Sequence, residues 1–182
     1  MDINSTLIPG CFEIVSKYIP DTRGEFIKFF NFDLFHDYGL EVDFKEEYCT
    51  ISKKNVIRGM HFQIPPMDHV KKVYCISGEV IDVVLDLRKG SPFFNKYQVF
   101  HLSSVKGNQL YIPKGCAHGF FAHTESAKLN YHVSSVYSSE HDTGILWDSF
   151  GFDWPIKHPI LSERDKSFSP LNKFQSPFYF SY

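Results

Sequence analysis

The chain has 182 residues and a formal net charge of -2, and its 19 Phe and 10 Tyr help to bring the aromatic share to 17%. At this length one domain, residues 1–182, can bury a core without disulfides or structural metals. The 19 Lys and Arg are scattered among 21 Asp and Glu, which argues against nucleic-acid binding because that function needs a basic patch.

No apolar run approaches the roughly 18 residues that a membrane helix needs, and the N-terminus lacks the regions of a signal peptide. The four cysteines lie far apart without a CxxC pair, and Cys75 sits in an apolar run where a buried free thiol is the ordinary interpretation. We therefore expect a soluble, unprocessed protein of the reducing cytoplasm with no membrane partner.

Short apolar or alternating segments separated by turn residues run through the whole chain, which indicates an all-β fold. They fall at residues 12–19, 25–30, 55–63, 71–77, 79–87, 97–103, 109–113, 119–123 and 128–137. Aromatic residues pack well on pleated surfaces, so the high aromatic share points the same way. One helical turn is predicted at 30–39, where Asn31 or Asp33 can cap a short apolar face that ends at Gly39.

Two of these segments, 71–77 and 79–87, flank Gly78 closely enough to form a hairpin. Segment 79–87 is apolar on both faces, as expected for a strand inside a sandwich or barrel. The aromatic tail at 172–182 is expected to leave the sheet and pack on a neighbouring surface. Such a tail hints at a dimer.

Residues 107–118 read GNQLYIPKGCAH, which is a Gly, five residues, a Pro, one residue, a Gly, two residues and His118. This spacing resembles the second signature of the cupin β-barrels, in which the final His points into the barrel mouth. A lone histidine is more often a satisfied core residue, and the spacing around His118 reverses that preference. We predict a cupin-type double-stranded β-helix, or jelly-roll barrel, with short helical segments and an aromatic C-terminal tail.

Many cupins hold a transition metal with a His-x-His pair, a Glu and this later His. Here the first signature offers only His61, followed by Phe62 and Gln63. Lys71 stands where the Glu is expected, with six residues between it and Gly78. Because an ammonium group repels a dication, we expect a barrel without a metal, in which Lys71 directs its charge at an anionic group.

The chain resembles the dTDP-4-dehydrorhamnose 3,5-epimerase family from about Pro9 to Pro170. Five motifs carry the resemblance in order: RGMHFQ (58–63), VYCISGEVIDVVLDLRKGSP (73–92), YIPKGCAHGF (111–120), GFDWP (151–155) and PILSERD (159–165). The resemblance implies an isomerase, without a cofactor, that inverts carbons 3 and 5 of a nucleotide-linked 4-keto-6-deoxy sugar. Such an enzyme would serve deoxysugar biosynthesis for a cell-surface glycan such as the O-antigen of lipopolysaccharide, as a homodimer.

Four catalytic residues follow from the resemblance. His61 is the expected base, and Asp165 the carboxylate that orients it. Lys71 would stabilise the enolate, and Tyr131 would return a proton from the opposite face after acidification by the nearby cation. Taken singly, Asp165 could be an exposed loop charge, Tyr131 a core residue and Lys71 a solvated edge lysine. Their joint presence at family positions favours the catalytic interpretation.

Substrate-binding positions also follow from the resemblance. Arg23 and Arg58 match diphosphate-binding arginines, because planar guanidinium groups suit a pyrophosphate. Tyr137 matches an aromatic that stacks on the nucleobase, and His118 a histidine of the sugar pocket. The expected substrate-binding set is Arg23, Phe26, Arg58, His118, Tyr137, Glu46 and Tyr48.

Three positions depart from the family pattern. Glu46 and Tyr48 replace a Gln and an Asn that contact sugar and phosphate, and Lys28 stands where a Glu is usual. The nucleotide could therefore be dTDP, CDP or GDP, and one or both carbons could be inverted. Two other functions stay open, a non-catalytic cupin that binds a sugar or a protein partner, and a 3,4-ketoisomerase of the same fold.

Overall fold

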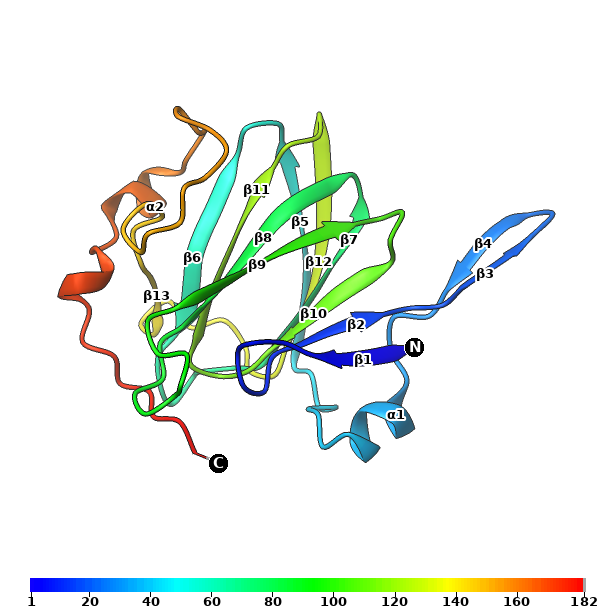
Figure 1. Cartoon of the computed structure of the whole chain (residues 1–182), viewed down its shortest axis with the longest axis horizontal. Helices are drawn as coiled ribbons and strands as arrows, with labels where there is room; N and C mark the ends of the chain where they lie inside the picture. The colour runs from blue at the N-terminus through cyan, green and yellow to red at the C-terminus, as the bar shows by residue number, and fades with distance from the viewer. Residues whose placement is uncertain (182) are drawn as a thin grey trace.

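A computed structural model describes residues 1–181, which form two antiparallel sheets packed face to face (Figure 1). The first sheet has the order β1 (Asp2–Ser5), β2 (Phe12–Val15), β10 (Asn108–Ile112), β7 (Lys71–Ser77), β12 (Ser126–Val133) and β5 (Glu46–Lys53). The second has the order β13 (Asp142–Gly144), β6 (Ile57–Gln63), β11 (Cys116–Ala122), β8 (Glu79–Asp86) and β9 (Tyr97–Ser103). The all-β prediction is confirmed.

The space between the sheets is filled by alternate residues of the strands, because successive side chains of a strand point to opposite faces. Along β12, the buried positions are Ala127, Leu129, Tyr131 and Val133, and the residues between them are exposed or partly exposed. Leu129 packs with buried residues of both sheets, and truncating such a side chain to alanine typically costs about 2–5 kcal/mol. The same alternation that builds this core aims Tyr131 inward.

The predicted hairpin at Gly78 is wrong. β7 pairs with β10 and β12 in the first sheet, whereas β8 pairs with β11 and β9 in the second. The chain therefore crosses between the sheets at Gly78, whose φ of +79° favours glycine and where a Cβ would collide with the backbone of Ser126. The expected burial of 79–87 is confirmed, because β8 lies inside its sheet and is buried from Val83 to Asp86.

The C-terminal region and the helix α1 each pack on the outer face of one of the two sheets. On the five-stranded sheet, the C-terminal region with α2 (Glu163–Ser167) and the 3-10 turn η1 (Leu171–Lys173) packs Phe174 and Phe178 against core residues such as Phe62. The predicted tail thus leaves the sheet and packs on its own chain. On the six-stranded sheet lies α1 (Phe32–Asp37), whose N-cap Asn31 accepts a hydrogen bond from the backbone N–H of Leu34 as predicted.

A two-stranded hairpin, β3 (Tyr18–Asp21) and β4 (Gly24–Ile27), extends away from the barrel between β2 and α1 (Figure 1). Its strands pair with each other and belong to neither large sheet. Most of its residues are exposed, including Ile19 and Phe26. This hairpin is joined to the barrel at its base, where the Tyr18 hydroxyl donates to the carbonyl oxygen of Ser104 at 2.5 Å.

Within residues 1–181 no helix is long and apolar enough to cross a membrane. All four cysteines are free, and Cys75 is buried as predicted. Burial raises the pKa of the Cys11 thiol to about 12, so this group stays protonated at neutral pH.

Candidate functional site

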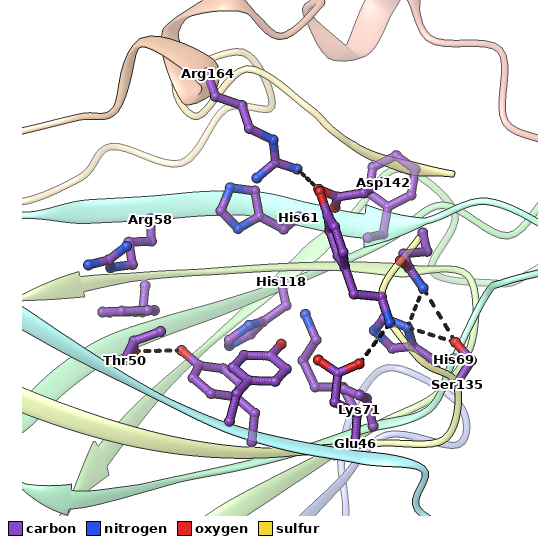
Figure 2. A pocket seen from close by; sticks show the side chains of 17 residues that line it. Glu46, Thr50, Arg58, His61, His69, Lys71, His118, Ser135, Asp142 and Arg164 are labelled. Atoms are coloured by element: carbon purple, nitrogen blue, oxygen red, sulfur yellow. Dashed lines mark hydrogen bonds and ion pairs between the residues drawn. The ribbon is translucent and has the colours of Figure 1, made fainter. Parts of the chain in front are cut away.

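A cavity of about 290 Å³ opens between the two sheets. It is lined by Glu46, Tyr48, Thr50, Arg58, His61, Phe62, Gln63, His69, Lys71, His118, Phe120, Tyr131, Val133, Ser135, Tyr137, Asp142 and Arg164. Most residues that the sequence singled out are therefore gathered around one pocket. Figure 2 shows that the side chains of His61, Lys71 and His118 converge there from strands of both sheets.

His61 forms a close pair with Asp165. The His61 Nε2 and Asp165 Oδ1 atoms are 2.8 Å apart, and the other carboxylate oxygen accepts a hydrogen bond from the backbone N–H of Gly59 at 3.2 Å. Asp165 lies in α2, where Ser162 caps the first turn by accepting from the Asp165 N–H. The interpretation of Asp165 as an exposed loop charge is wrong, because its side chain is 4% exposed.

The surroundings of Asp165 favour its charged form. Burial by itself raises the pKa of this carboxyl group, but the hydrogen bond and charge of His61 act against it, helped by Gly59 and Ser162. The net effect is a pKa below the ordinary value. A carboxylate held ionised next to an imidazole fixes its tautomer and stabilises the imidazolium that forms when the ring accepts a proton. The His61 side chain remains 28% exposed and faces the pocket.

Lys71 is a buried cation at the pocket. It lies on β7, an interior strand between β10 and β12, so the alternative of a solvated edge lysine is wrong. Burial lowers its pKa to about 8, although the carboxylates of Asp82 and Asp142 oppose this shift. The ammonium therefore remains largely protonated at neutral pH in a place where water screens its charge poorly.

Tyr131 is buried on β12, on the sheet that faces His61 across the pocket. Its hydroxyl lies 3.4 Å from the Thr50 Oγ1 atom, a contact drawn in Figure 2. The prediction that its phenol is acidified is wrong, because burial raises its pKa well above 10 and outweighs the opposing hydrogen bond of Thr50. The phenol stays protonated, which suits a proton donor.

His118 pairs with an acid that the sequence analysis did not single out. His118 Nε2 lies 2.7 Å from the Asp82 Oδ2 atom, and both side chains are buried. Burial lowers the pKa of His118 in spite of the Asp82 carboxylate. The signal for Asp82 was an acid inside the apolar run 79–87, since a buried carboxylate needs a partner.

Two further pocket residues were also missed, Asp142 on β13 and Arg164 on α2. They form an ion pair with each other at the side of the pocket near His61 (Figure 2). Arg164 stands directly before Asp165 in the LSERD segment, and this adjacency was the available signal. An arginine and a carboxylate here supply charged groups for the polar part of a ligand.

Next to Lys71 lies a polar cluster around His69. The Gln63 Nε2 atom is 3.2 Å from His69 Nδ1 and 3.3 Å from Ser135 Oγ. Burial, reinforced by the charge of Lys71, lowers the pKa of His69 to about 3. The ring is therefore neutral at physiological pH, and Lys71 is the cation of this part of the pocket.

Four more predicted residues line the pocket: Arg58, Tyr137, Glu46 and Tyr48. The Nε of Arg58 donates to Ser52 Oγ at 2.9 Å, which directs the guanidinium along the edge strand β5. Tyr137 is 63% exposed, and its backbone N–H donates to a carboxylate oxygen of Glu46 at 2.8 Å.

Arg23 and Phe26 lie elsewhere, on the protruding β3–β4 hairpin. Neither lines the pocket of its own chain, and Arg23 pairs with Asp21 at the surface. The expected pair of arginines, Arg23 and Arg58, is therefore not brought together within one chain. The reason is the path of the hairpin, which leads away from the barrel (Figure 1).

Among residues 1–181 no group of three or more His, Cys, Asp or Glu side chains is arranged to hold a metal ion. His61 and His118 instead each pair with a carboxylate. A metal-free pocket stays a prediction.

The fold and the pocket together define a cupin-type barrel enzyme that is equipped for acid–base chemistry. The family model of dTDP-4-dehydrorhamnose 3,5-epimerase matches residues 5–173. A dTDP-4-dehydrorhamnose 3,5-epimerase of Shigella flexneri is 38% identical over 168 residues, which cover 91% of this chain and 93% of that relative. The chain belongs to the dTDP-4-dehydrorhamnose 3,5-epimerase family and is an isomerase.

Solved structures agree. The dTDP-6-deoxy-D-glucose-3,5-epimerase RmlC of Legionella pneumophila Philadelphia 1, crystallised with dTDP-4-keto-L-rhamnose, matches with a TM-score of 0.93 at 31% identity and 99% coverage of both chains. NovW, a 4-keto-6-deoxy sugar epimerase of Streptomyces spheroides, gives a TM-score of 0.90 at 32% identity, covering 94% of this chain and 88% of that chain. The predicted cupin jelly-roll fold is confirmed, and these relatives do not favour the binding-protein or ketoisomerase alternatives.

Proposed function

We propose that this epimerase inverts carbon 3, carbon 5 or both in a nucleotide-linked 4-keto-6-deoxy sugar, within deoxysugar biosynthesis for a cell-surface glycan. One observation carries the proposal: a His61–Asp165 pair faces a buried tyrosine across a pocket that also contains a buried lysine. The names of the relatives support a dTDP-linked substrate as the first candidate, ahead of CDP- or GDP-linked sugars.

The proposed reaction starts with proton removal by His61. A C–H bond next to a ketone is acidic because its electron pair can move into the carbonyl group and form an enolate. His61 accepts the proton, and Asp165 stabilises the resulting imidazolium. The ammonium of Lys71 stabilises the negative charge on the enolate oxygen, which it can do strongly because the Lys71 side chain is itself buried.

Inversion requires that the carbon regain a proton from the opposite face. We assign this step to Tyr131, whose hydroxyl is protonated and lies on the sheet opposite His61. The enolate electron pair takes the phenolic proton, and the phenolate then recovers a proton from solvent. His118, held by Asp82, would line the sugar part of the pocket.

Nucleotide binding is assigned to the rim. Arg58 would contact the diphosphate and Tyr137 the nucleobase, since a guanidinium suits phosphate oxygens and an exposed ring can stack. We further propose that the chain acts as one domain, as a homodimer in the cytoplasm. In this dimer the protruding hairpin would bring Arg23 and Phe26 to the pocket of the second copy, which explains why neither lines its own pocket.

Deuterium exchange tests the proposed reaction. Incubated in D₂O with a dTDP-linked 4-keto-6-deoxy hexose, the enzyme is expected to place deuterium on the carbons next to the ketone, and NMR of the product identifies which carbons are inverted. His61→Asn should abolish the exchange while the circular dichroism spectrum stays unchanged. Absence of exchange with dTDP-, CDP- and GDP-linked substrates alike would refute the proposal, and movement of the carbonyl group would indicate a ketoisomerase.

A further inference from the structure

Tyr48 stacks on the ring of Tyr131. The two residues are direct partners in the antiparallel register of β5 and β12, so their side chains leave the sheet on the same face. Their ring centroids are 4.7 Å apart and their planes differ by 14°. Tyr48 belongs to the edge strand β5, lines the pocket and is 37% exposed, whereas Tyr131 is 4% exposed.

Tyr131 belongs to the buried core cluster that includes Leu129, and at the pocket it has two further contacts besides the stack with Tyr48. Its hydroxyl meets Thr50 at 3.4 Å, which is long for a hydrogen bond between hydroxyl groups. The ring of His118 meets it edge to face with the centroids 6.1 Å apart. Tyr48 is thus the aromatic side chain that stacks on the Tyr131 ring, and its removal would leave Tyr131 without this stacking partner.

We propose that Tyr48 is a positioning residue that holds the Tyr131 phenol where it can protonate the enolate from the face opposite His61. This inference rests on the proposed function. Placement matters because an acid must lie within hydrogen-bond reach of the carbon it protonates, and a displacement of about 1 Å can cost roughly 100-fold in rate. Tyr48 acts in this way through its ring, without transferring a proton itself.

The ratio of deuterium exchange to inversion distinguishes a positioning role of Tyr48 from a general structural role. Once His61 has removed the proton, the enolate has two possible fates. Protonation by Tyr131 inverts the carbon, whereas return of a proton from the His61 imidazolium restores the original configuration. In D₂O the imidazolium can exchange its proton with solvent, so the second fate labels the substrate without inverting it. The ratio of exchange to inversion therefore reports how well Tyr131 is placed.

The hydroxyl of Tyr48 is not needed for this role. Burial, reinforced by the charges of Glu46 and Asp142, raises the pKa of Tyr48 to about 12. A phenylalanine keeps the stacked ring and removes the hydroxyl, whereas an alanine removes both. The pair Tyr48→Phe and Tyr48→Ala thus separates positioning by the ring from proton transfer by the hydroxyl.

The experiment measures deuterium in the recovered substrate and in the inverted product for the wild type, Tyr48→Ala and Tyr48→Phe. Ile51→Ala is the matched control, because Ile51 is an exposed apolar residue on the same strand and does not line the pocket. We expect Tyr48→Ala to raise the exchange-to-inversion ratio roughly tenfold or more, with exchange still measurable. Tyr48→Phe and Ile51→Ala should keep the wild-type ratio.

Three results would overturn the inference while leaving the proposed function intact: an unchanged ratio in Tyr48→Ala, an equal rise in Tyr48→Phe, or loss of exchange and inversion together in Tyr48→Ala. The last result would mean that Tyr48 supports more than the placement of the acid. Retained exchange in Tyr48→Ala shows at the same time that the variant is folded. Absence of exchange in the wild type would overturn both the proposed function and this inference.

Discussion

Lys71 is the residue whose setting most directly predicts a pH dependence. Its pKa is lowered to about 8 by burial, so its ammonium is charged below that pH and neutral above it. Only the charged form can stabilise an enolate electrostatically. We therefore expect kcat/KM to fall as the pH rises through about 8, and a pH profile from 6 to 10 checks this limb.

Substitution of Lys71 identifies the group that titrates. Lys71→Met should lower kcat by roughly 100- to 1000-fold, the usual effect of removing a group that stabilises an oxyanion. Lys71→Arg keeps a positive charge at all accessible pH values. If this variant retains activity, the limb near pH 8 should disappear, and a limb with an unchanged midpoint would assign the titration to another group.

The negative charge of Asp165 is expected to be needed for proton removal by His61. Asp165→Asn keeps the size of the side chain and removes the charge that stabilises a protonated His61. We expect the rate of deuterium exchange to fall roughly 100-fold or more, with a smaller change in KM, because general base catalysis typically contributes at least that much. Asp142→Asn, which alters a rim residue, is the comparison. Equal loss in both variants would argue against a specific role for the buried pair.

Sequence reasoning placed most of its candidate site residues correctly at the pocket, because the motifs that carry the family resemblance contain or align them. It missed Asp82, since a single acid in an apolar strand does not reveal its partner, which here is 36 positions away in the sequence. It also predicted the wrong direction for the pKa of Tyr131. Lys71 and Tyr131 line the same pocket, but the depth of burial that decides the pKa shift is a property of the folded barrel.

At the scale of elements, successive lysines of β7 point to opposite faces of the six-stranded sheet. Lys71 faces the pocket, whereas the next residue, Lys72, projects to the outer face, where four aromatic rings surround its ammonium within 5.9 Å: Phe30, Phe35, Phe44 and Tyr74. Its Nζ donates to the carbonyl oxygen of Phe29 at 3.3 Å, and the residue is 1% exposed. Lys72 thereby fastens the segment that contains α1 to the six-stranded sheet.

This buried lysine predicts how stability changes with pH. Burial lowers the pKa of Lys72 from 10.5 to about 8, although Glu47 opposes the shift. Between those pH values the unfolded chain binds a proton that the folded chain has released, so stability rises with pH. The gain from Lys72 approaches ~3 kcal/mol near pH 10.5. Urea unfolding of the wild type and Lys72→Met at pH 7 to 10 should show a steeper rise in the wild type, because Lys71, whose pKa is also lowered to about 8, contributes a rise in both proteins. The same slope in both proteins would contradict the prediction.

Helices and strands could be predicted from the sequence where the pattern that specifies them lies within a few neighbouring residues. The helical turn capped by Asn31 and the buried strand β8 follow from capping chemistry and from an apolar run. By contrast, β5 was not among the predicted strands. It is an edge strand with exposed residues on both faces, so buried and exposed positions alternate poorly along it. The pairing of β7 and β8 was wrong because a turn residue such as Gly78 does not reveal whether the next strand stays in the same sheet.

At the scale of the whole molecule, the protruding hairpin is the feature that the sequence could not place. The family resemblance marked Arg23 and Phe26 as substrate-binding, but nothing in the sequence indicates which copy of the chain they serve. The hairpin extends away from the barrel (Figure 1), and neither residue lines the pocket of its own chain. An isolated hairpin of two short strands is marginally stable, so contacts with a second copy of the chain would stabilise it.

A mixing experiment tests this shared site. Arg23→Ala and His61→Asn should each be nearly inactive as homodimers, the first because diphosphate binding is lost and the second because the base is absent. If the hairpin serves the partner, a mixed dimer contains one site with both Arg23 and His61 and one site with neither. Random mixing of equal amounts then restores about a quarter of the wild-type activity per protomer. If Arg23 serves its own chain, every site of the mixed dimer lacks one residue, and the mixture should stay inactive. Sedimentation equilibrium of the wild type checks the dimer itself, and a monomeric, fully active enzyme would refute the shared site.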